Sequence, residues 1–162
     1  MALILDGSAG VTFPNSTVQA SSGVVLQVVQ ASLLATGFST TSATAVATGL
    51  TATITPKFAT SKILVSIIAN GVQKNAGNAL NGAVLYVYKN GSNLQRIGEY
   101  IGYTNTSVVN SIGSAGIDYL DSPATTSAIT YALFMSSTVG GQSVNLNAGG
   151  DYSNIVLTEI SA

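Results

Sequence analysis

The acidic residues that lie nearest to one another in the sequence are Asp118 and Asp121, and Asp151 follows them at a distance. A calcium ion needs several carboxylate and carbonyl oxygens gathered at one place. Three carboxylates spread this widely are a weak signal for such a site. We therefore interpret them as solvated turn residues and predict that the protein binds no metal ion.

The remaining chemical groups give no convincing catalytic set. Glu99 and Glu159 are the only glutamates, whereas a glycosidase needs two carboxylates that face each other across a cleft. Ser61 and Lys62 are adjacent on an expected strand, so their side chains point to opposite faces and cannot form a nucleophile–base pair. The chain has no Cys and no His, which removes thiol nucleophiles and the commonest general base. We predict that the protein is not an enzyme and has no catalytic residues and no cofactor.

Seven tyrosines offer the other recognisable chemistry, because their rings can stack on sugars. Most of them alternate along expected strands and are interpreted as core residues with a hydrogen-bonded hydroxyl. Tyr100 and Tyr103 differ, since they stand beside a polar stretch that contains Asn105 and Asn110. We predict that these four residues form a receptor-contacting loop.

Charge is scarce in this chain. Only 7% of the residues are charged, the net charge is −1, and the chain contains 20 Ser, 18 Thr, 12 Asn and 17 Gly. Such a surface has no basic patch that would bind nucleic acid, and it has little like-charge repulsion between copies. This composition favours permanent assembly with partners, and the alternative is a neutral monomer coated with Ser and Thr.

The hydrophobic pattern has a period of two from Gly23 onward, which is typical of β-strands. Lys89-Asn90-Gly91-Ser92 predicts a type I′ hairpin, because Asn-Gly supplies the two positive φ angles of that turn. The polar stretch 104–116 is interpreted as a long loop or an edge strand. Strands are expected at 24–30, 50–55, 62–69, 83–89, 94–101, 129–136, 142–147 and 154–160.

Residues 1–22 differ from the rest, because turn-rich pieces separate short apolar ones. We interpret this segment as an extended arm that lies on a partner, and the alternative is a first strand of the same domain. The residues expected to dock are the apolar ones and the adjoining proline: Leu3, Ile4, Leu5, Val11, Phe13 and Pro14.

These patterns together predict one all-β domain at residues 23–162, preceded by the arm at 1–22. Short antiparallel strands joined by Gly, Asn and Ser turns indicate an antiparallel β-sandwich, most simply a jelly roll. An immunoglobulin-like sandwich is the alternative, although its Cys and Trp hallmarks are absent. The start of the chain lacks a basic region typical of secretory signals, and no apolar run reaches membrane-spanning length. We expect synthesis in the cytoplasm and no membrane insertion.

Three stretches resemble bacteriophage virion and tail-fibre-like proteins. The first runs from VLQVVQ (25–30) through FSTTSATAVATGLTATITP (38–56) to SKILV (61–65). The second is the ending NAGGDYSNIVLTEISA (147–162), and the third is GVTFPNSTVQ (10–19), which is similar to a segment found upstream in phage fibres. The resemblance implies a virion structural protein with a tumour-necrosis-factor-like jelly roll that trimerises.

The resemblance implies partners and a location as well. We expect a homotrimer on the virion, assembled in the host cytoplasm, that contacts phage capsid or tail proteins and no nucleic acid. One expected role is a capsid decoration (cement) protein whose arm docks on the shell. The other is a receptor-binding tail fibre or spike that touches a host surface glycan. The chain is short and shows no shaft or coiled coil, which favours decoration.

Overall fold

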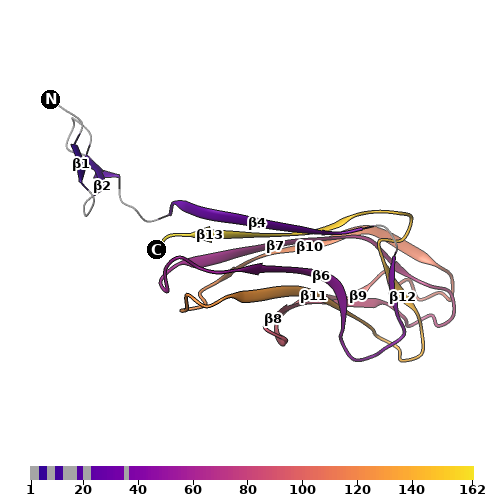
Figure 1. The fold of residues 1–162 in the computed structure, drawn as a ribbon. Helices are drawn as coiled ribbons and strands as arrows, with labels where there is room; N and C mark the ends of the chain where they lie inside the picture. The colour runs from indigo at the N-terminus through magenta and orange to yellow at the C-terminus, as the bar shows by residue number, and fades with distance from the viewer. Residues whose placement is uncertain (1–3, 7–9, 13–17, 20–22, 35–36) are drawn as a thin grey trace.

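The protein is a β-sandwich built from two antiparallel sheets, as Figure 1 shows for this computed structural model. The structure describes residues 4–6, 10–12, 18–19, 23–34 and 37–162. Within those residues every regular element is a strand and none is a helix. This confirms the prediction of an all-β, antiparallel sandwich.

Each sheet contains four long strands. The first sheet has the order β4 (Val25–Leu33), β13 (Ser153–Ile160), β7 (Lys62–Lys74) and β10 (Asn110–Asp121). Two short strands, β12 (Val144–Leu146) and β5 (Phe38–Thr40), extend it beside the end of β7. The second sheet has the order β6 (Val46–Ile54), β11 (Ile129–Ser137), β8 (Ala83–Lys89) and β9 (Ser92–Ile101).

The pairing of these eight strands is that of a jelly roll. In chain order the first long strand pairs with the last (β4 with β13), the second with the seventh (β6 with β11), the third with the sixth (β7 with β10) and the fourth with the fifth (β8 with β9). Such nested antiparallel pairs arise when one long ribbon of paired strands wraps around a core.

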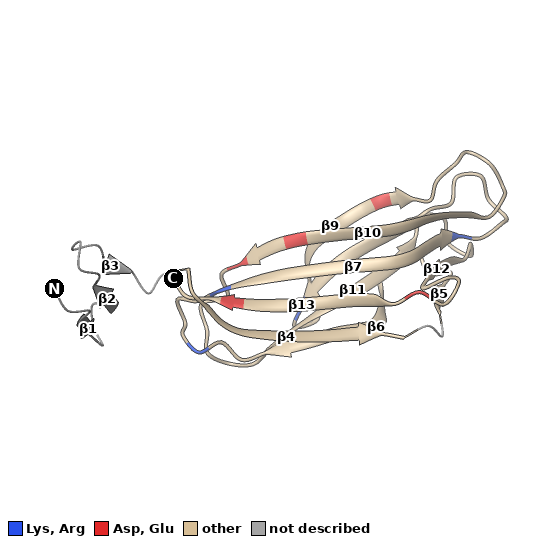
Figure 2. Cartoon of the chain, turned by 90° about the horizontal axis from the view of Figure 1, so that it is seen from above, with Lys and Arg blue, Asp and Glu red and all other residues tan. Residues whose placement is uncertain are grey.

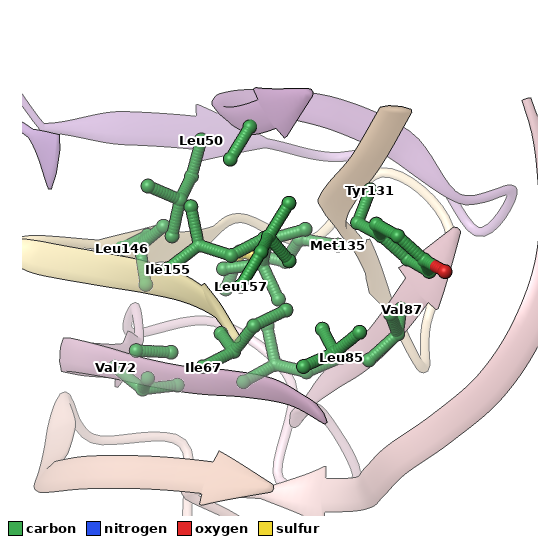
Figure 3. Close-up of a cluster of buried hydrophobic side chains, with 14 of the residues drawn as sticks. Leu50, Ile67, Val72, Leu85, Val87, Tyr131, Met135, Leu146, Ile155 and Leu157 are labelled. Atoms are coloured by element: carbon green, nitrogen blue, oxygen red, sulfur yellow. The ribbon is translucent and has the colours of Figure 1, made fainter. Parts of the chain in front are cut away.

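The core fills the space between the two sheets. Inward residues alternate with outward ones along each strand, as in β13, where Ile155, Leu157 and Glu159 are buried. Figure 3 shows Ile67 and Ile155 of the first sheet in the same buried cluster as Leu85 and Tyr131 of the second. Removing this apolar area from water supplies the main driving force for folding.

The predicted hairpin is present at the end of β8. Asn90 and Gly91 both have positive φ angles, 49° and 79°. The Asn90 side-chain oxygen accepts a hydrogen bond from the backbone N–H of Thr130 at 2.9 Å, which ties the turn to β11. Asparagine therefore serves both the turn geometry and the pairing of the sheet.

Three predictions about strands and tyrosines need correction. The stretch 104–116 is partly loop, but its second half begins β10, an edge strand that runs on to Asp121. Asp118 and Asp121 are therefore strand residues and not turn residues, and Asp121 is buried. Of the tyrosines only Tyr131 is fully buried, whereas Tyr86 and Tyr88 are half-exposed on the outer face of β8, where Tyr88 stacks on Phe134.

The N-terminal segment contributes three short strands, β1 (Ile4–Asp6), β2 (Gly10–Thr12) and β3 (Val18–Gln19), which pair with one another in a separate sheet. Ile4, Leu5 and Val11 of the predicted docking set lie in β1 and β2. Leu3, Phe13 and Pro14 lie outside the described residues. The docking role of this segment stays a prediction.

Candidate functional site

The sandwich has two unlike ends, which we call the base end and the loop end. At the base end Gly23 enters the fold beside the C-terminus, and its N–H donates to the Ser161 carbonyl at 2.9 Å. Short connections at 55–61, 90–91 and 122–128 share this end. The long connections 75–82, 102–109 and 138–152 gather at the opposite, loop end, together with residues 37–45 (Figure 1). Loops carried on a rigid scaffold are where binding residues concentrate.

A hollow of about 540 Å³ opens among three of the long connections. Its size falls within the range of small-molecule sites. Leu80, Tyr100 and Tyr103 are exposed by 57%, 54% and 41%, which is high for large apolar or aromatic side chains. The residues that line it are Leu80, Tyr100, Tyr103, Thr138 and Val139.

Hydrogen bonds between the connections hold the hollow in shape. The Thr138 hydroxyl accepts from the Gly82 N–H at 2.8 Å and donates to the Leu80 carbonyl at 3.2 Å. The Thr138 N–H donates to the Gly82 carbonyl at 2.9 Å. Gly82 also lies so close to Tyr100 that a Cβ would come within 2.9 Å of the Tyr100 Cα. These contacts hold the backbones of the connections together around the hollow, and such preorganisation lowers the entropy cost of binding.

The two tyrosines form a pair at the rim of this hollow. Their ring centres are 5.8 Å apart in an edge-to-face arrangement, and the Tyr103 N–H donates to the Tyr100 carbonyl at 3.0 Å. Tyr100 has a φ of 58°, a left-handed conformation that costs a non-glycine residue about 1–2 kcal/mol. Backbone strain of this kind clusters at functional sites, so the pair is the strongest recognition candidate.

The predicted asparagines do not line the hollow. Asn105 sits in the exposed turn that follows, also with a positive φ, of 53°. Asn110 begins β10, and its side-chain amide donates to the Gly102 carbonyl at 3.0 Å, which ties the two ends of the 102–109 connection together. Of the four predicted receptor residues, the structure therefore brings Tyr100 and Tyr103 together and leaves Asn105 and Asn110 outside the lining of the hollow.

Sequence reasoning missed Lys74, which supports the same connection. Its side chain is fully buried, and its ammonium donates to the Thr106 carbonyl at 2.5 Å. A buried ammonium is costly unless it is hydrogen-bonded, so the contact holds the 102–109 connection on the end of β7. The only sequence signal is a lysine five residues after the mostly apolar run 63–69.

At the base end an ion pair links the two sheets. Asp121 of β10 accepts a hydrogen bond from the Tyr131 hydroxyl at 2.6 Å, and the Lys89 ammonium lies 2.7 Å from the same carboxylate oxygen. Burial, and next the bond to Asp121, raise the pKa of Tyr131 far above its ordinary value. Tyr131 therefore stays a neutral donor, and the three groups act as a cross-link without chemistry of their own.

Glu159 is a second buried carboxylate at the base end. Its oxygens accept from the Gln27 side chain at 2.5 Å and from the Lys57 N–H at 2.7 Å. Burial by itself raises the pKa of Glu159, but these hydrogen bonds outweigh that effect and hold the pKa below its ordinary value. The charged carboxylate thereby fixes the connection 55–61 against β4 and β13.

The acidic residues considered as a cation site do not meet. Asp118 is exposed on β10, Asp121 is used by Lys89 and Tyr131, and Asp151 lies in the connection before β13 at the loop end. Among the described residues no three metal-ligating side chains gather at one place. In the same residues no helix has the length and hydropathy to cross a bilayer.

Comparison with known proteins identifies no family. No family model matches the chain, and no curated protein matches it. Among solved structures, the chain is similar to the crystal structure of the infectious bursal disease virus VP2 subviral particle, with 13% sequence identity and a TM-score of 0.48. The similarity covers 99% of this chain and 37% of that one, so this chain spans little more than a third of its length. The functional proposal therefore rests on this chain's own sequence and geometry.

Proposed function

We propose that this protein is a bacteriophage virion surface protein, specifically a homotrimeric capsid decoration (cement) protein. In this role residues 1–22 dock on the particle, the sandwich projects outward, and the area buried by docking stabilises the shell. The resemblance of residues 10–19, 25–65 and 147–162 to phage virion proteins supports the class. The proposal includes no catalytic step, no nucleic acid and no membrane insertion.

One observation carries the decoration role: the N-terminal segment and the tyrosine pair are at opposite ends of the sandwich. The N-terminal segment joins the sandwich at Gly23 on the base end, while Tyr100 and Tyr103 with their hollow are at the loop end. A protein attached through its N-terminal segment would therefore present the loop end to the surroundings.

The copy number of the chain per purified particle tests this role. A decoration protein is expected at a simple lattice fraction of the major shell protein. Deleting residues 1–22 should abolish particle binding while residues 23–162 keep their fold, measured by co-sedimentation and by thermal melting. A copy number of a few per cent of the shell protein, or full binding by the truncated chain, would contradict it.

The tyrosine hollow favours a second candidate function, a receptor-binding tail fibre or spike that contacts a host surface glycan. Tyrosine rings offer apolar faces and hydroxyl groups, and the Thr138 hydroxyl lies in the same lining, which suits a neutral sugar. Saturation-transfer NMR with host cell-wall oligosaccharides should give a signal that Tyr103→Ala removes. Leu120→Ala, at an exposed position on the far edge of the first sheet, is the matched control.

A further inference from the structure

Another hollow, which we call the base hollow, lies at the base end beside the point where the N-terminal segment joins the sandwich. Its volume is about 410 Å³. Phe58 and Val24 are exposed by 57% and 43%, and exposed apolar side chains grouped at one place mark an interaction surface. The residues that line the base hollow are Val24, Leu26, Phe58, Thr60, Ser161 and Ala162.

Hydrogen bonds hold the connection 55–61, which carries Phe58, in place. The Phe58 carbonyl accepts from the Ser61 N–H at 3.1 Å, and the Lys57 N–H donates to the buried Glu159 carboxylate at 2.7 Å. Phe58 is therefore exposed on a backbone that is already fixed, which lowers the entropy cost when its ring binds a partner. Fixed aromatic side chains of this kind are the usual anchors of an interface.

The base hollow is within reach of any surface that the N-terminal segment touches. The Ser161 N–H donates to the Val24 carbonyl at 2.9 Å, which ties the entering chain to the wall of the hollow. Only three residues separate Gln19, at the end of β3, from Gly23, and so short a piece of chain spans at most about 14 Å. A surface that binds β1–β3 must therefore lie close to the base hollow as well.

The exposed charged side chains of the base end, among the residues that the structure describes, are both lysines. Lys57 lies in the connection 55–61, and Lys62 directly follows it at the start of β7. The acidic side chains of this end, Asp121 and Glu159, are buried. Figure 2 shows blue positions at this end of the sandwich, beside the C-terminus. An apolar hollow with lysines at its rim complements an acidic surface that offers an apolar side chain.

We propose that the base hollow is a second contact with the particle, in which it receives an apolar side chain of the shell protein while Lys57 and Lys62 face carboxylates around that side chain. This inference rests on the decoration role proposed above and names the chemistry of the shell surface, which is acidic with a protruding apolar group. The docked N-terminal segment holds the hollow near the shell, so even a small contact adds to the affinity through its high effective concentration.

Co-sedimentation of the full chain with empty shells that lack it, at increasing chain concentration, tests the contact. Phe58→Ser should weaken binding about tenfold, which is the size expected when an aromatic anchor is truncated. Phe58→Leu should restore most of the affinity, because the apolar contact returns. Val108→Ser is the matched control, since Val108 is exposed by 59% but lies at the loop end, and it should bind like the wild type. Thermal melting should show that all three variants keep the fold.

The salt dependence of binding tests the acidic chemistry of the shell surface. Lys62→Gln should weaken binding about threefold at low salt and have no effect at about 0.5 M salt, where exposed charges are screened. Arg96→Gln on β9 removes the same charge elsewhere and should bind like the wild type at both salt concentrations. Lys62 is the better position to change, because the Lys57 ammonium also donates to the Leu26 carbonyl at 3.0 Å.

Four outcomes would overturn the proposal, each in a different part. Binding of Phe58→Ser that equals the wild type, or an equal loss in Val108→Ser, overturns the contact at the base hollow. A lower light-scattering mass for free Phe58→Ser than for the wild type assigns the hollow to a contact between copies instead. Equal behaviour of Lys62→Gln and Arg96→Gln overturns the acidic surface. A wild-type chain that does not bind shells overturns the decoration role itself, which distinguishes that failure from the others.

Discussion

The base end and the loop end of this sandwich are held together by different chemistry. At the base end buried carboxylates make the contacts: Asp121 pairs with Lys89 and Tyr131, and Glu159 holds the connection 55–61. At the loop end hydroxyl and amide groups do this work, as in the bond from the Ser137 hydroxyl to Asn81 at 2.6 Å. Lys74 is the one fully buried cation among the described residues of that end.

This difference shows where a chain with few charged residues places them in its fold. Charges at the base end lock the two sheets where the chain enters and leaves, and are withheld from the exposed rim of the hollow. Recognition at the loop end would therefore depend on shape, apolar contact and neutral hydrogen bonds, and would be little affected by salt. Four substitutions test this contrast, from the largest expected effect to the smallest.

Asp121→Ala should have the largest effect. It leaves the buried Tyr131 hydroxyl without its acceptor and Lys89 without its partner, and should cost about 2–4 kcal/mol of the free energy of unfolding. Urea denaturation measures this. Asp118→Ala on the exposed face of the same strand is the control and should change stability by less than about 0.5 kcal/mol. Equal losses would show that the base end is not locked by this ion pair.

Glu159→Gln should change the pH dependence of stability. Because the fold lowers the pKa of Glu159, its ionised form stabilises the protein above the ordinary value of 4.5, and this contribution is lost as the pH falls through the lowered value. At neutral pH the variant should lose about 1–2 kcal/mol, since an amide N–H would face the donors at Gln27 or Lys57. Urea unfolding of the variant and of the wild type should differ at pH 7, and the two free energies should converge in acid once the pH is below the lowered pKa of Glu159.

Thr138→Val should have a smaller effect at the loop end. It removes the hydroxyl that bridges Gly82 and Leu80 and should cost about 1 kcal/mol of the free energy of unfolding. Hydrogen exchange should speed up in the connection 75–82, with exchange in β13 unchanged. An equally large change at the base end would break the distinction between the two ends.

Lys74→Met should have the smallest effect on global stability. An apolar side chain of similar length replaces a buried ammonium that donates to the Thr106 carbonyl, so the free energy of unfolding should change by less than about 1 kcal/mol or rise. The connection 102–109 nevertheless loses its anchor, and its amides should exchange faster. A large global loss would mean that the loop end, like the base end, is locked by charge.

The sequence predicts a strand well where the hydrophobic pattern along the strand and a turn motif at its end agree. The expected strand 83–89 coincides with β8, because alternating apolar residues lead directly into Asn90-Gly91. The sequence indicates β10 only as an alternative to a loop, because an edge strand with Gly113, Gly116 and two serines has little hydrophobic pattern. Outward tyrosines such as Tyr86 resembled core because period two does not tell which face is covered.

The candidate site was only half predictable for a related reason. Tyr100 and Tyr103 are close in sequence and stand beside a polar loop, so their exposure could be inferred. Leu80, Thr138 and Val139 join them only through the jelly-roll wrapping, which brings distant connections to one end. No local pattern marks such residues, because the contacts are set by topology and not by spacing.

The bond from Gly23 to Ser161 has a consequence for engineering. The first and last residues of the sandwich are neighbours, since the Gly23 nitrogen lies 2.9 Å from the Ser161 carbonyl oxygen. Residue 162 can therefore be joined to residue 23 by a short linker, and the chain can be reopened at Gly149–Gly150. Such a circular permutant keeps every strand pair but moves both termini to the loop end. A docking segment fused there would attach the sandwich to the particle through its loop end, so that the base end would face the surroundings.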